Sequence, residues 1–429
     1  MADTDDPLAR MLAGRFVDPE TGSLFACPIG RVVVAPSLDG REKDLVAGLG
    51  RRLAVVADEN TWEALGRRVA AAVRPHREVV LPDPHPDAET VEELRRRTSG
   101  ADALVAVGSG TINDLCKAAA EKDKRRYAVF ATAPSMNGYV TGTASITVKG
   151  LKLSLAARPP AAAFFDLGVL AAAPARMIRS GIGDCLARAT AQTDWLLAHM
   201  LTGSAYSETP FAVQADDEPV LLDRCADAAA GDAAAVETLV RMLLLSGLGM
   251  ALVGSSHPAS MGEHLVSHYI DMLAMPHPRS LHGEQVAVAS WSLARLQAQI
   301  LGSAAPPVLA PTWIDEETMR RRYGPVADDC IRSLKRKAVD QAACDRLNSR
   351  LASDWPRLRA KLRAAMLPVA RVERAMNAAG LPMTGAALGL DPGFYREAIL
   401  HARELRDRFG ILDIAADCGA LDEFAQGEG

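Results

Sequence analysis

A regular alternation of short apolar segments with helical segments is the feature that most limits what this chain can fold into. The apolar segments are 31–37, 53–59, 77–82, 103–110 and 127–134. Residues 88–98 and 111–124, which lie between them, have helical periodicity. Apolar strands that alternate with helices are typical of βαβ units, in which helices cover both faces of a parallel sheet. We therefore expect an α/β domain at the N-terminus.

The pattern becomes almost purely helical after Pro174. Residues 144–166 still have strand character, with a hairpin-like break at Lys149-Gly150. Beyond them, apolar residues recur with helical spacing toward the C-terminus. We expect two domains, an α/β domain over residues 1–174 and an all-helical domain over residues 175–429.

One uncharged run, Met242 to Gly262, is long enough to raise the question of a membrane span. Its apolar part ends near Val253, and glycine, serine, histidine and proline follow. A transmembrane helix needs about 20 consecutive apolar residues, so this run predicts a buried core helix and no membrane span.

Composition narrows the classes of function. The 429 residues carry 48 Lys and Arg against 53 Asp and Glu, a net charge of −5 that does not suit a nucleic-acid-binding protein. The seven cysteines are scattered without a Cys-x-x-Cys pair, so neither a disulfide framework nor a thiolate zinc site is expected. The acidic N-terminus lacks a signal-peptide pattern, and we expect a cytoplasmic protein. The charged stretch 316–365 is either solvated or an interface, which leaves a homodimer open.

A glycine turn joins one predicted strand to the helix that follows it. Gly108 and Gly110 lie directly between the two. Glycine lets a ligand approach the backbone closely, and the free N–H groups at a helix N-terminus bind phosphate oxygens. Asp114, on the first helical turn, suits capping or the helix dipole. Asn113 stands where the dinucleotide-binding fingerprint has a third glycine, so a plain tight turn is the alternative.

Two further strand ends would lie at the same edge of a parallel sheet. Asp58 follows the strand that begins at residue 53 and could hydrogen-bond an adenosine ribose, which favours NAD over NADP. A solvated loop acid is the alternative. The loop 132–138 is rich in small hydroxylated residues and either lines the same cleft or is an ordinary turn.

A set of metal-binding residue types occurs in the helical half. His264 and His268 are four residues apart, so they lie on the same side of a helix. His282 and Asp184 complete the set. One carboxylate and two imidazoles suit Zn²⁺, Fe²⁺ or Ni²⁺ and leave a coordination position for a substrate oxygen. Two hydrogen-bonded core or surface histidines would give the same spacing.

Several motifs together resemble the sn-glycerol-1-phosphate dehydrogenases. They are GSGTINDLCK, ATAPSMNGYVTGTASI, SGIGDCLA, SSHPASMGEHLVSH, LHGEQVA and RDRFGILDIAADCGAL, in the family's order from about residue 25 to residue 425. This family belongs to the iron-containing alcohol dehydrogenase and dehydroquinate synthase-like superfamily. The resemblance implies a Rossmann-like NAD-binding domain, a helical domain, and an active site in the cleft between them.

The resemblance also implies roles for single residues. With Asp58, the cofactor-binding residues would be Gly108, Ser109, Gly110, Thr111, Asp114, Thr132, Ser135 and Thr141, and the turn from Gly108 to Asp114 would hold the pyrophosphate of NAD or NADP. Asp184, His264 and His282 would bind a divalent metal, with zinc favoured and nickel or iron as alternatives. His268 would face the substrate and, like Asp184, take part in substrate binding and catalysis.

Two departures from the family pattern bear on the substrate. Asn137 replaces the aspartate of the family's Ser-Met-Asp-Gly segment, which is expected to contact the substrate hydroxyls. Asparagine keeps the size but adds donors and removes charge, so an altered substrate is one reading. Arg188 stands where the broader alcohol dehydrogenases often have histidine. A cation there fits a phosphorylated substrate, and a structural arginine is the alternative. Lys117 and Lys152 are further candidates for phosphate binding.

The reaction that the resemblance implies is reversible hydride transfer between NAD(P)H and dihydroxyacetone phosphate, which gives sn-glycerol 1-phosphate. The metal would act as a Lewis acid on the ketone oxygen, and His268 as a proton relay or a hydroxyl ligand. Three alternatives stay open. They are a sugar phosphate cyclase of the dehydroquinate synthase type, a dehydrogenase of an unphosphorylated polyol, and a non-catalytic binding protein.

Overall fold

The chain forms two compact units in the computed structural model, which describes residues 6–148 and 151–428. The first unit consists of residues 1–185 and 208–255, and the second of residues 186–207 and 256–429. The hairpin break expected at Lys149-Gly150 lies outside the described residues. Each unit is described below by itself.

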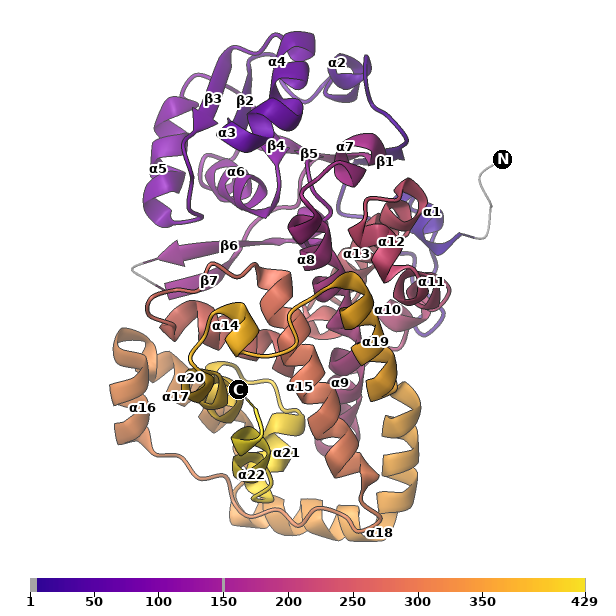
Figure 1. Cartoon of the computed structure of the whole chain (residues 1–429), viewed down its shortest axis with the longest axis vertical. Helices are drawn as coiled ribbons and strands as arrows, with labels where there is room; N and C mark the ends of the chain where they lie inside the picture. Colours follow the sequence, from indigo (N-terminus) through magenta and orange to yellow (C-terminus); the bar gives the residue numbers. More distant parts are fainter. Residues whose placement is uncertain (1–5, 149–150, 429) are drawn as a thin grey trace. The chain divides into compact units, whose positions relative to one another are not determined.

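A six-stranded sheet forms the centre of the first unit (Figure 1), with the strand order β1-β8-β5-β4-β2-β3. Its strands are β1 (Arg31–Ala35), β2 (Leu53–Asp58), β3 (Arg77–Leu81), β4 (Ala103–Gly108), β5 (Arg126–Ala131) and β8 (Ala162–Asp166). All neighbouring pairs are parallel. The α/β prediction is therefore confirmed, including the strands at each of the five expected segments.

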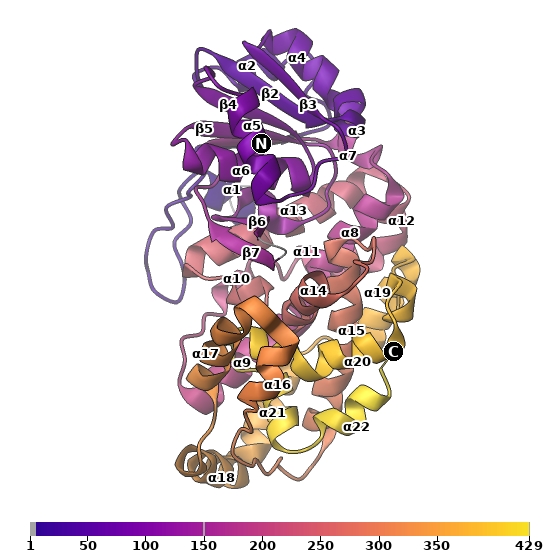
Figure 2. The ribbon, with the colours of Figure 1, turned by 90° about the vertical axis from the view of Figure 1, so that its left-hand side faces the viewer.

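Both faces of this sheet are buried, which explains the near-continuous apolar strand sequences. Val55 and Val105 belong to a core cluster with side chains of the π-helical turn η1 (Trp62–Gly66) and α4 (Arg67–Val73). Residues between them in the strands, such as Val56, are equally inaccessible. α6 (Gly110–Lys122) packs on β4, β5 and β2, and beside it lies α5 (Ala88–Arg97), as Figure 2 also shows. Because successive strand side chains point to opposite faces, helices cover the sheet on both sides.

A small antiparallel hairpin follows the main sheet in sequence. It pairs β6 (Thr143–Val148) with β7 (Leu151–Ala156). A single bridge between Asp87 and Thr147 ties β6 to the chain that leads into α5. The strand character expected for residues 144–166 is confirmed, and its last part returns to the main sheet as β8.

Four helices between residues 208 and 255 also belong to the first unit, whereas the sequence placed a domain boundary at 174–175. They are α10 (Thr209–Ala212), α11 (Asp217–Asp223), α12 (Cys225–Ala229) and α13 (Ala233–Val253). The physical reason is the packing of α13, which contacts α7 (Leu167–Ala171) next to β8 and the 3₁₀ helix η2 (Asn137–Val140). Helical periodicity cannot show which core a helix joins.

α13 is also the one helix among the described residues that is long and apolar enough to cross a membrane. More than half of its most apolar window, 56%, is buried inside the protein. Its buried side chains, such as Leu239 and Leu248, pack within the first unit. This is the arrangement expected of the buried core helix that the sequence predicts.

The second unit is helical. Its longer helices are α9 (Arg188–Thr202), α14 (Gly262–Leu273), α15 (His282–Gly302), α16 (Glu316–Tyr323), α17 (Ala327–Lys337), α18 (Gln341–Ala365), α19 (Val369–Ala379) and α20 (Pro392–His401), followed by α21 (Ile411–Asp417) and α22 (Leu421–Gln426). α14 and α15 pack against each other and against α9. Residues such as Val266 and Leu293 place these helices in one continuous apolar core. The candidate histidines are therefore carried by two helices, α14 and α15, that are held in place by this core.

Gly181 marks the closest packing of a helix on the loop that follows β5. It lies on α8 (Ala175–Leu186), and a Cβ atom there would be 1.8 Å from the carbonyl oxygen of Pro134. Backbone is the obstacle, so no side-chain rotation can relieve the contact. Only glycine allows α8 to approach residues 134–135 this closely.

We expect Gly181→Ala to lower the free energy of unfolding by about 3 kcal/mol, because the added methyl group must displace backbone. Gly302 provides the matched control, since a Cβ there meets nothing within 4 Å. Gly302→Ala should leave stability unchanged or raise it slightly. Urea unfolding followed by circular dichroism measures both variants, and equal midpoints would contradict the packing described here.

Candidate active site

The glycine turn lies at the carboxyl end of β4, as the sequence predicts. Gly108 ends the strand, Ser109 precedes α6, and Gly110 and Thr111 begin it. A Cβ at Gly108 would lie 2.5 Å from Cβ of Ile112, so the turn is too tight for a side chain. The first N–H groups of α6 point out of the helix and favour an anionic ligand. The backbone thus fits the pyrophosphate cradle that the resemblance implies.

The loop after β5 lies beside this turn. The amide N–H of Thr132 donates to the carbonyl oxygen of Gly108 at 3.2 Å, which joins the ends of β5 and β4. A Cβ at Gly110 would lie 3.1 Å from Sδ of Met136, in the same loop. Ser135 is buried, and its carbonyl oxygen accepts from the hydroxyl of Ser180 at 3.3 Å. The structure therefore brings Thr132 and Ser135 close to the glycine turn.

Asp58 lies at the end of β2, the strand next to β4. Val56 pairs with Ala106 in this parallel ladder, so Asp58 and Gly108 occupy the same level at the carboxyl edge. The Asp58 carboxylate accepts from the N–H of Thr61 at 2.8 Å and caps a short helix. The position suits a ribose contact, which stays a prediction.

Asp114 and Lys117 on α6 are buried and make structural contacts. The Asp114 carboxylate accepts from the N–H of Ser145 on β6 at 3.1 Å, and burial raises its pKa. The Lys117 ammonium donates to the carbonyl oxygens of Gly138, Thr141 and Thr143 at 2.8, 3.1 and 2.9 Å. With its donors engaged in this way, Lys117 holds the loop and does not serve as a phosphate ligand. A cofactor contact of Asp114 stays a prediction.

Asn137 connects the loop to Asp184 and to α13. Its backbone N–H donates to Oδ2 of Asp184 at 2.7 Å. Its side-chain amide donates to the hydroxyl of Ser246 at 3.1 Å. Thr141, at the end of this loop, donates its hydroxyl to the carbonyl oxygen of Gly138 at 3.1 Å. Asn137 thus orients Asp184 through its backbone, while its side chain is held toward α13.

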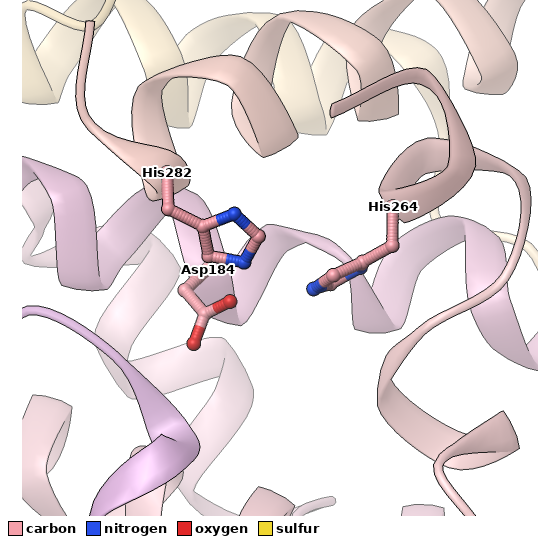
Figure 3. A group of neighbouring side chains, drawn as sticks. All are labelled: Asp184, His264 and His282. Atoms are coloured by element: carbon pink, nitrogen blue, oxygen red, sulfur yellow. The ribbon is translucent and has the colours of Figure 1, made fainter. Parts of the chain in front are cut away.

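The structure brings together the three residues expected to bind a metal. Asp184 comes from α8, His264 from α14, and His282 is the first residue of α15. One ligand atom of each lies within 4.8 Å of the others. Figure 3 shows the three side chains gathered around one space. A carboxylate and two imidazoles are a donor set for zinc and related divalent metals.

Both histidines of the group have a hydrogen-bond partner at Nδ1, so Nε2 is the nitrogen that we expect to bind a metal. Nδ1 of His264 lies 3.0 Å from Oε1 of Glu263, and Nδ1 of His282 lies 3.1 Å from the hydroxyl of Ser267. Ser267 in turn donates to Oε1 of Gln285 at 2.8 Å. Partners of this kind fix the tautomer and the ring orientation of metal-binding histidines. The local chemistry therefore fits a divalent metal.

Glu263 is a completely buried carboxylate that the sequence analysis did not select. It accepts from the N–H of Met261 at 2.7 Å and from the hydroxyl of Thr190 at 2.9 Å, besides its contact with His264. Burial alone would raise its pKa, but the hydrogen bond and charge of His264 outweigh this effect and lower it. Its position directly before a candidate metal-binding histidine could have identified Glu263 from the sequence. No sequence pattern would have identified Ser267 or Ser246.

His268 lies one helical turn beyond His264 on α14. The two ring centroids are 6.3 Å apart, against 5.1 Å between His264 and His282. Burial lowers the pKa of His268, and the charges of His264, Arg406 and His282 add to this effect. A neutral imidazole can accept a proton, as a relay requires. Arg188 begins α9, next to Thr190, and its contact with substrate stays a prediction.

Comparison with known proteins decides the family. Residues 33–174 match the model of the iron-containing alcohol dehydrogenases. A glycerol-1-phosphate dehydrogenase of Thermococcus kodakarensis is 34% identical over 58% of this chain and 72% of its own length. The chain belongs to the glycerol-1-phosphate dehydrogenase family. A family member from Geobacillus stearothermophilus is 29% identical over 90% of this chain and 92% of its own.

Solved structures support the same fold. A probable glycerol dehydrogenase from Sinorhizobium meliloti superposes with a TM-score of 0.61 at 20% identity, covering 93% of this chain and 98% of that one. The expected combination of a Rossmann-like part and a helical part is therefore confirmed. As a member of this family, the chain is an NAD(P)-dependent oxidoreductase.

We expect Glu263→Gln to weaken zinc binding by about 10- to 100-fold, because the substitution removes the negative charge behind His264 while keeping its size. Competition between the protein and a chromophoric chelator measures this affinity without any assay of catalysis. Asp184→Ala and His282→Ala should lose the metal altogether and the activity with it.

The matched control for this experiment is Glu373→Gln, which changes an exposed glutamate on α19. It should bind zinc as the wild type does. An unchanged zinc affinity in Glu263→Gln would remove Glu263 from the metal site.

Proposed function

We propose that the protein reduces dihydroxyacetone phosphate to sn-glycerol 1-phosphate with NADH or NADPH and catalyses the reverse reaction. Several relatives that are similar in sequence are named glycerol-1-phosphate dehydrogenases. The observation that supports it most directly is the group formed by Asp184, His264 and His282, with ligand atoms within 4.8 Å of one another. A dehydrogenase of this kind needs such a group near the reacting oxygen.

The proposed site has one group of residues that binds the cofactor and another that binds the metal. The backbone at Gly108–Thr111 binds the cofactor pyrophosphate, with Thr132, Ser135 and Thr141 in the neighbouring loop and Asp58 at the ribose. Asp184, His264 and His282 hold a divalent metal, with zinc favoured over nickel and iron. When bound, the metal supplies Lewis acidity toward the ketone oxygen and the nicotinamide supplies the hydride.

His268 is the residue to which we assign proton transfer. Its pKa lies below the ordinary value for histidine because of burial and of the neighbouring cations. It is therefore a neutral acceptor at physiological pH, suited to take the hydroxyl proton when the alcohol is oxidised and to return it when the ketone is reduced. The backbone N–H of Asn137 keeps Asp184 in one orientation during this exchange.

The side chain of Asn137 favours a second candidate, a related ketone and polyol pair as substrate. Its amide donates to Ser246 and brings no negative charge to the substrate hydroxyls. In this second candidate function, the protein is a dehydrogenase of an unphosphorylated polyol. The sugar phosphate cyclase of the initial alternatives has no specific contact in its favour.

The proposal also concerns the setting of the enzyme. We place it in a reducing compartment, the cytoplasm, on the scattered positions of its cysteines in the sequence. The partner we expect is a small phosphorylated ketone or polyol, with neither nucleic acid nor a membrane. A homodimer remains part of the proposal.

The decisive experiment follows NADH oxidation by the purified protein with dihydroxyacetone phosphate, before and after EDTA, and after addition of Zn²⁺ or Ni²⁺. We expect oxidation that stops with EDTA and returns with the metal. A cyclase would show no net oxidation of NADH, because it regenerates its cofactor within one turnover. Failure with this substrate but activity with an unphosphorylated ketone would favour the second candidate.

Asn137→Asp restores the residue that the family usually carries. If sn-glycerol 1-phosphate is the native product, kcat/KM for dihydroxyacetone phosphate should rise, because a carboxylate accepts hydrogen bonds from the substrate hydroxyls more strongly. A loss of kcat/KM, with an intact fold, would indicate that Asn137 suits a different substrate. Ser246→Ala, which removes the partner of the amide, serves as the comparison.

A further inference from the structure

A chain of hydrogen bonds continues behind His282, beyond the serine that contacts it. Ser267 donates its hydroxyl to Oε1 of Gln285 at 2.8 Å. The side-chain amide nitrogen of Gln285 in turn donates to Oδ1 of Asp271 at 3.1 Å. All four residues belong to the second unit, and only 4% of the Asp271 side chain is exposed. His282 is thereby connected to a buried carboxylate that the proposed reaction does not use.

Two helices that pack against each other supply the members of this chain in alternation. Ser267 and Asp271 are four residues apart on α14, and His282 and Gln285 are three residues apart on α15. Side chains with these spacings are neighbours on one face of a helix. Ser267 and Gln285 have no exposed surface. The chain therefore runs between the two helices, away from solvent.

The carboxylate of Asp271 gives the chain its direction. A carboxylate has no proton to donate, so only the NH₂ end of the Gln285 amide can face it. The same NH₂ group donates to the hydroxyl of Ser280 at 3.1 Å. Nε2 of His277 lies 3.0 Å from the same oxygen of Asp271, which accepts there too. The carbonyl end of the amide must then face Ser267, whose hydroxyl has a single proton and donates it to that oxygen.

The direction of the chain determines which nitrogen of His282 carries a proton. Because its proton is committed to Gln285, Ser267 can only accept from His282. Nδ1 of His282 lies 3.1 Å from the hydroxyl oxygen, so Nδ1 is the protonated nitrogen. In a neutral imidazole Nε2 then keeps the lone pair that a metal ligand needs. If Ser267 donated to Nδ1 instead, the proton would be on Nε2 and would block it.

The two histidines of the group differ in how their tautomer can be set. His264 contacts the carboxylate of Glu263, an acceptor that by itself requires a proton on Nδ1. A serine hydroxyl both donates and accepts, so Ser267 alone is compatible with either tautomer of His282. A further group has to decide between the two tautomers, and Asp271 is the acceptor at the other end of the chain.

We propose that Asp271 is a positioning residue, which sets the tautomer of His282 through Gln285 and Ser267 and so prepares Nε2 to bind the metal. This inference rests on the proposed function, in which His282 is a metal ligand. It extends the metal site to a carboxylate that touches neither metal nor substrate.

The first measurement is made on the metal-free wild-type protein, labelled with ¹⁵N-histidine, at a pH where His282 is neutral. Nitrogen chemical shifts in NMR spectra distinguish protonated from unprotonated ring nitrogens, and His282→Gln identifies the signals of this residue. We expect a proton on Nδ1 and none on Nε2. A proton on Nε2 would overturn the inference without the need for any other variant.

Asp271→Asn keeps the size of the side chain but adds an NH₂ group, so the Gln285 amide is no longer held in one orientation. We expect zinc affinity, measured by competition with a chromophoric chelator, to fall by about 10-fold. The His282 signals should then show both tautomers. Asp271→Glu keeps the carboxylate and should recover part of the loss. Asp345→Asn is the matched control, because this exposed aspartate of α18 also accepts from a glutamine amide, that of Gln341 at 2.8 Å. It should bind zinc as the wild type does.

Asp271→Asn also removes a negative charge, and a double-mutant cycle with Ser267→Ala separates the two effects. If Asp271 acts through the chain, Asp271→Asn should change zinc affinity by less than about 2-fold once Ser267 is replaced. An undiminished effect in that background would assign Asp271 a purely electrostatic role and overturn the inference. Unchanged zinc affinity and an unchanged tautomer in a folded Asp271→Asn would overturn it as well.

These readouts are independent of turnover, so the two hypotheses can fail separately. A wild type that binds zinc but reduces no dihydroxyacetone phosphate would refute the proposed reaction, while the zinc competition still tests Asp271. A wild type that binds no zinc would refute the metal site of the proposed function. The tautomer of His282 in the wild type and in Asp271→Asn would then still show whether Asp271 sets it.

Discussion

The arrangement of the loop after β5, at the carboxyl edge of the first unit's sheet, depends on the buried ammonium group of Lys117. Its side chain has no exposed surface, and burial lowers its pKa to about 8 although Asp114 opposes the shift. Three carbonyl oxygens of the loop between β5 and β6 converge on it. A cation that cannot reach water holds these oxygens strongly, since each would otherwise be buried without a donor. α6 and the loop are thereby fixed as one body.

The loop that Lys117 holds also contacts Asp184 and the helix that carries it. The loop held by Lys117 carries Asn137, whose N–H binds the Asp184 carboxylate, and it accepts the close approach of α8 at Gly181. On the other helices, Glu263 and Ser267 orient the two histidines from behind. Each of the three candidate metal ligands thus has its own hydrogen-bond partner, and these partners differ in charge. A carboxylate stands behind His264 and a neutral hydroxyl behind His282, so the two imidazoles are unequal donors.

The sequence predicts the strands and the glycine turn well, and it selects three residues that the structure brings together, because each leaves a local pattern. Short apolar runs such as LAVVAD are typical of buried strands, and histidines four residues apart share a helix face. The contacts of Lys117 and Asp114 could not be read in this way. Whether a charged side chain on a helix faces solvent or carbonyl oxygens depends on a loop more than 20 residues away in sequence. For the same reason, Ser246 stayed hidden. Helical periodicity also does not show that α10–α13 group with the first unit.

The division of the chain has a consequence for dissecting it. The polypeptide passes from one unit to the other at 185–186, 207–208 and 255–256, so neither unit is a single continuous segment. No one cleavage point releases either of them whole, and a fragment ending at residue 174 lacks the helix α13 that packs beside β8 through α7. Recombining halves from different relatives requires three junctions and not one.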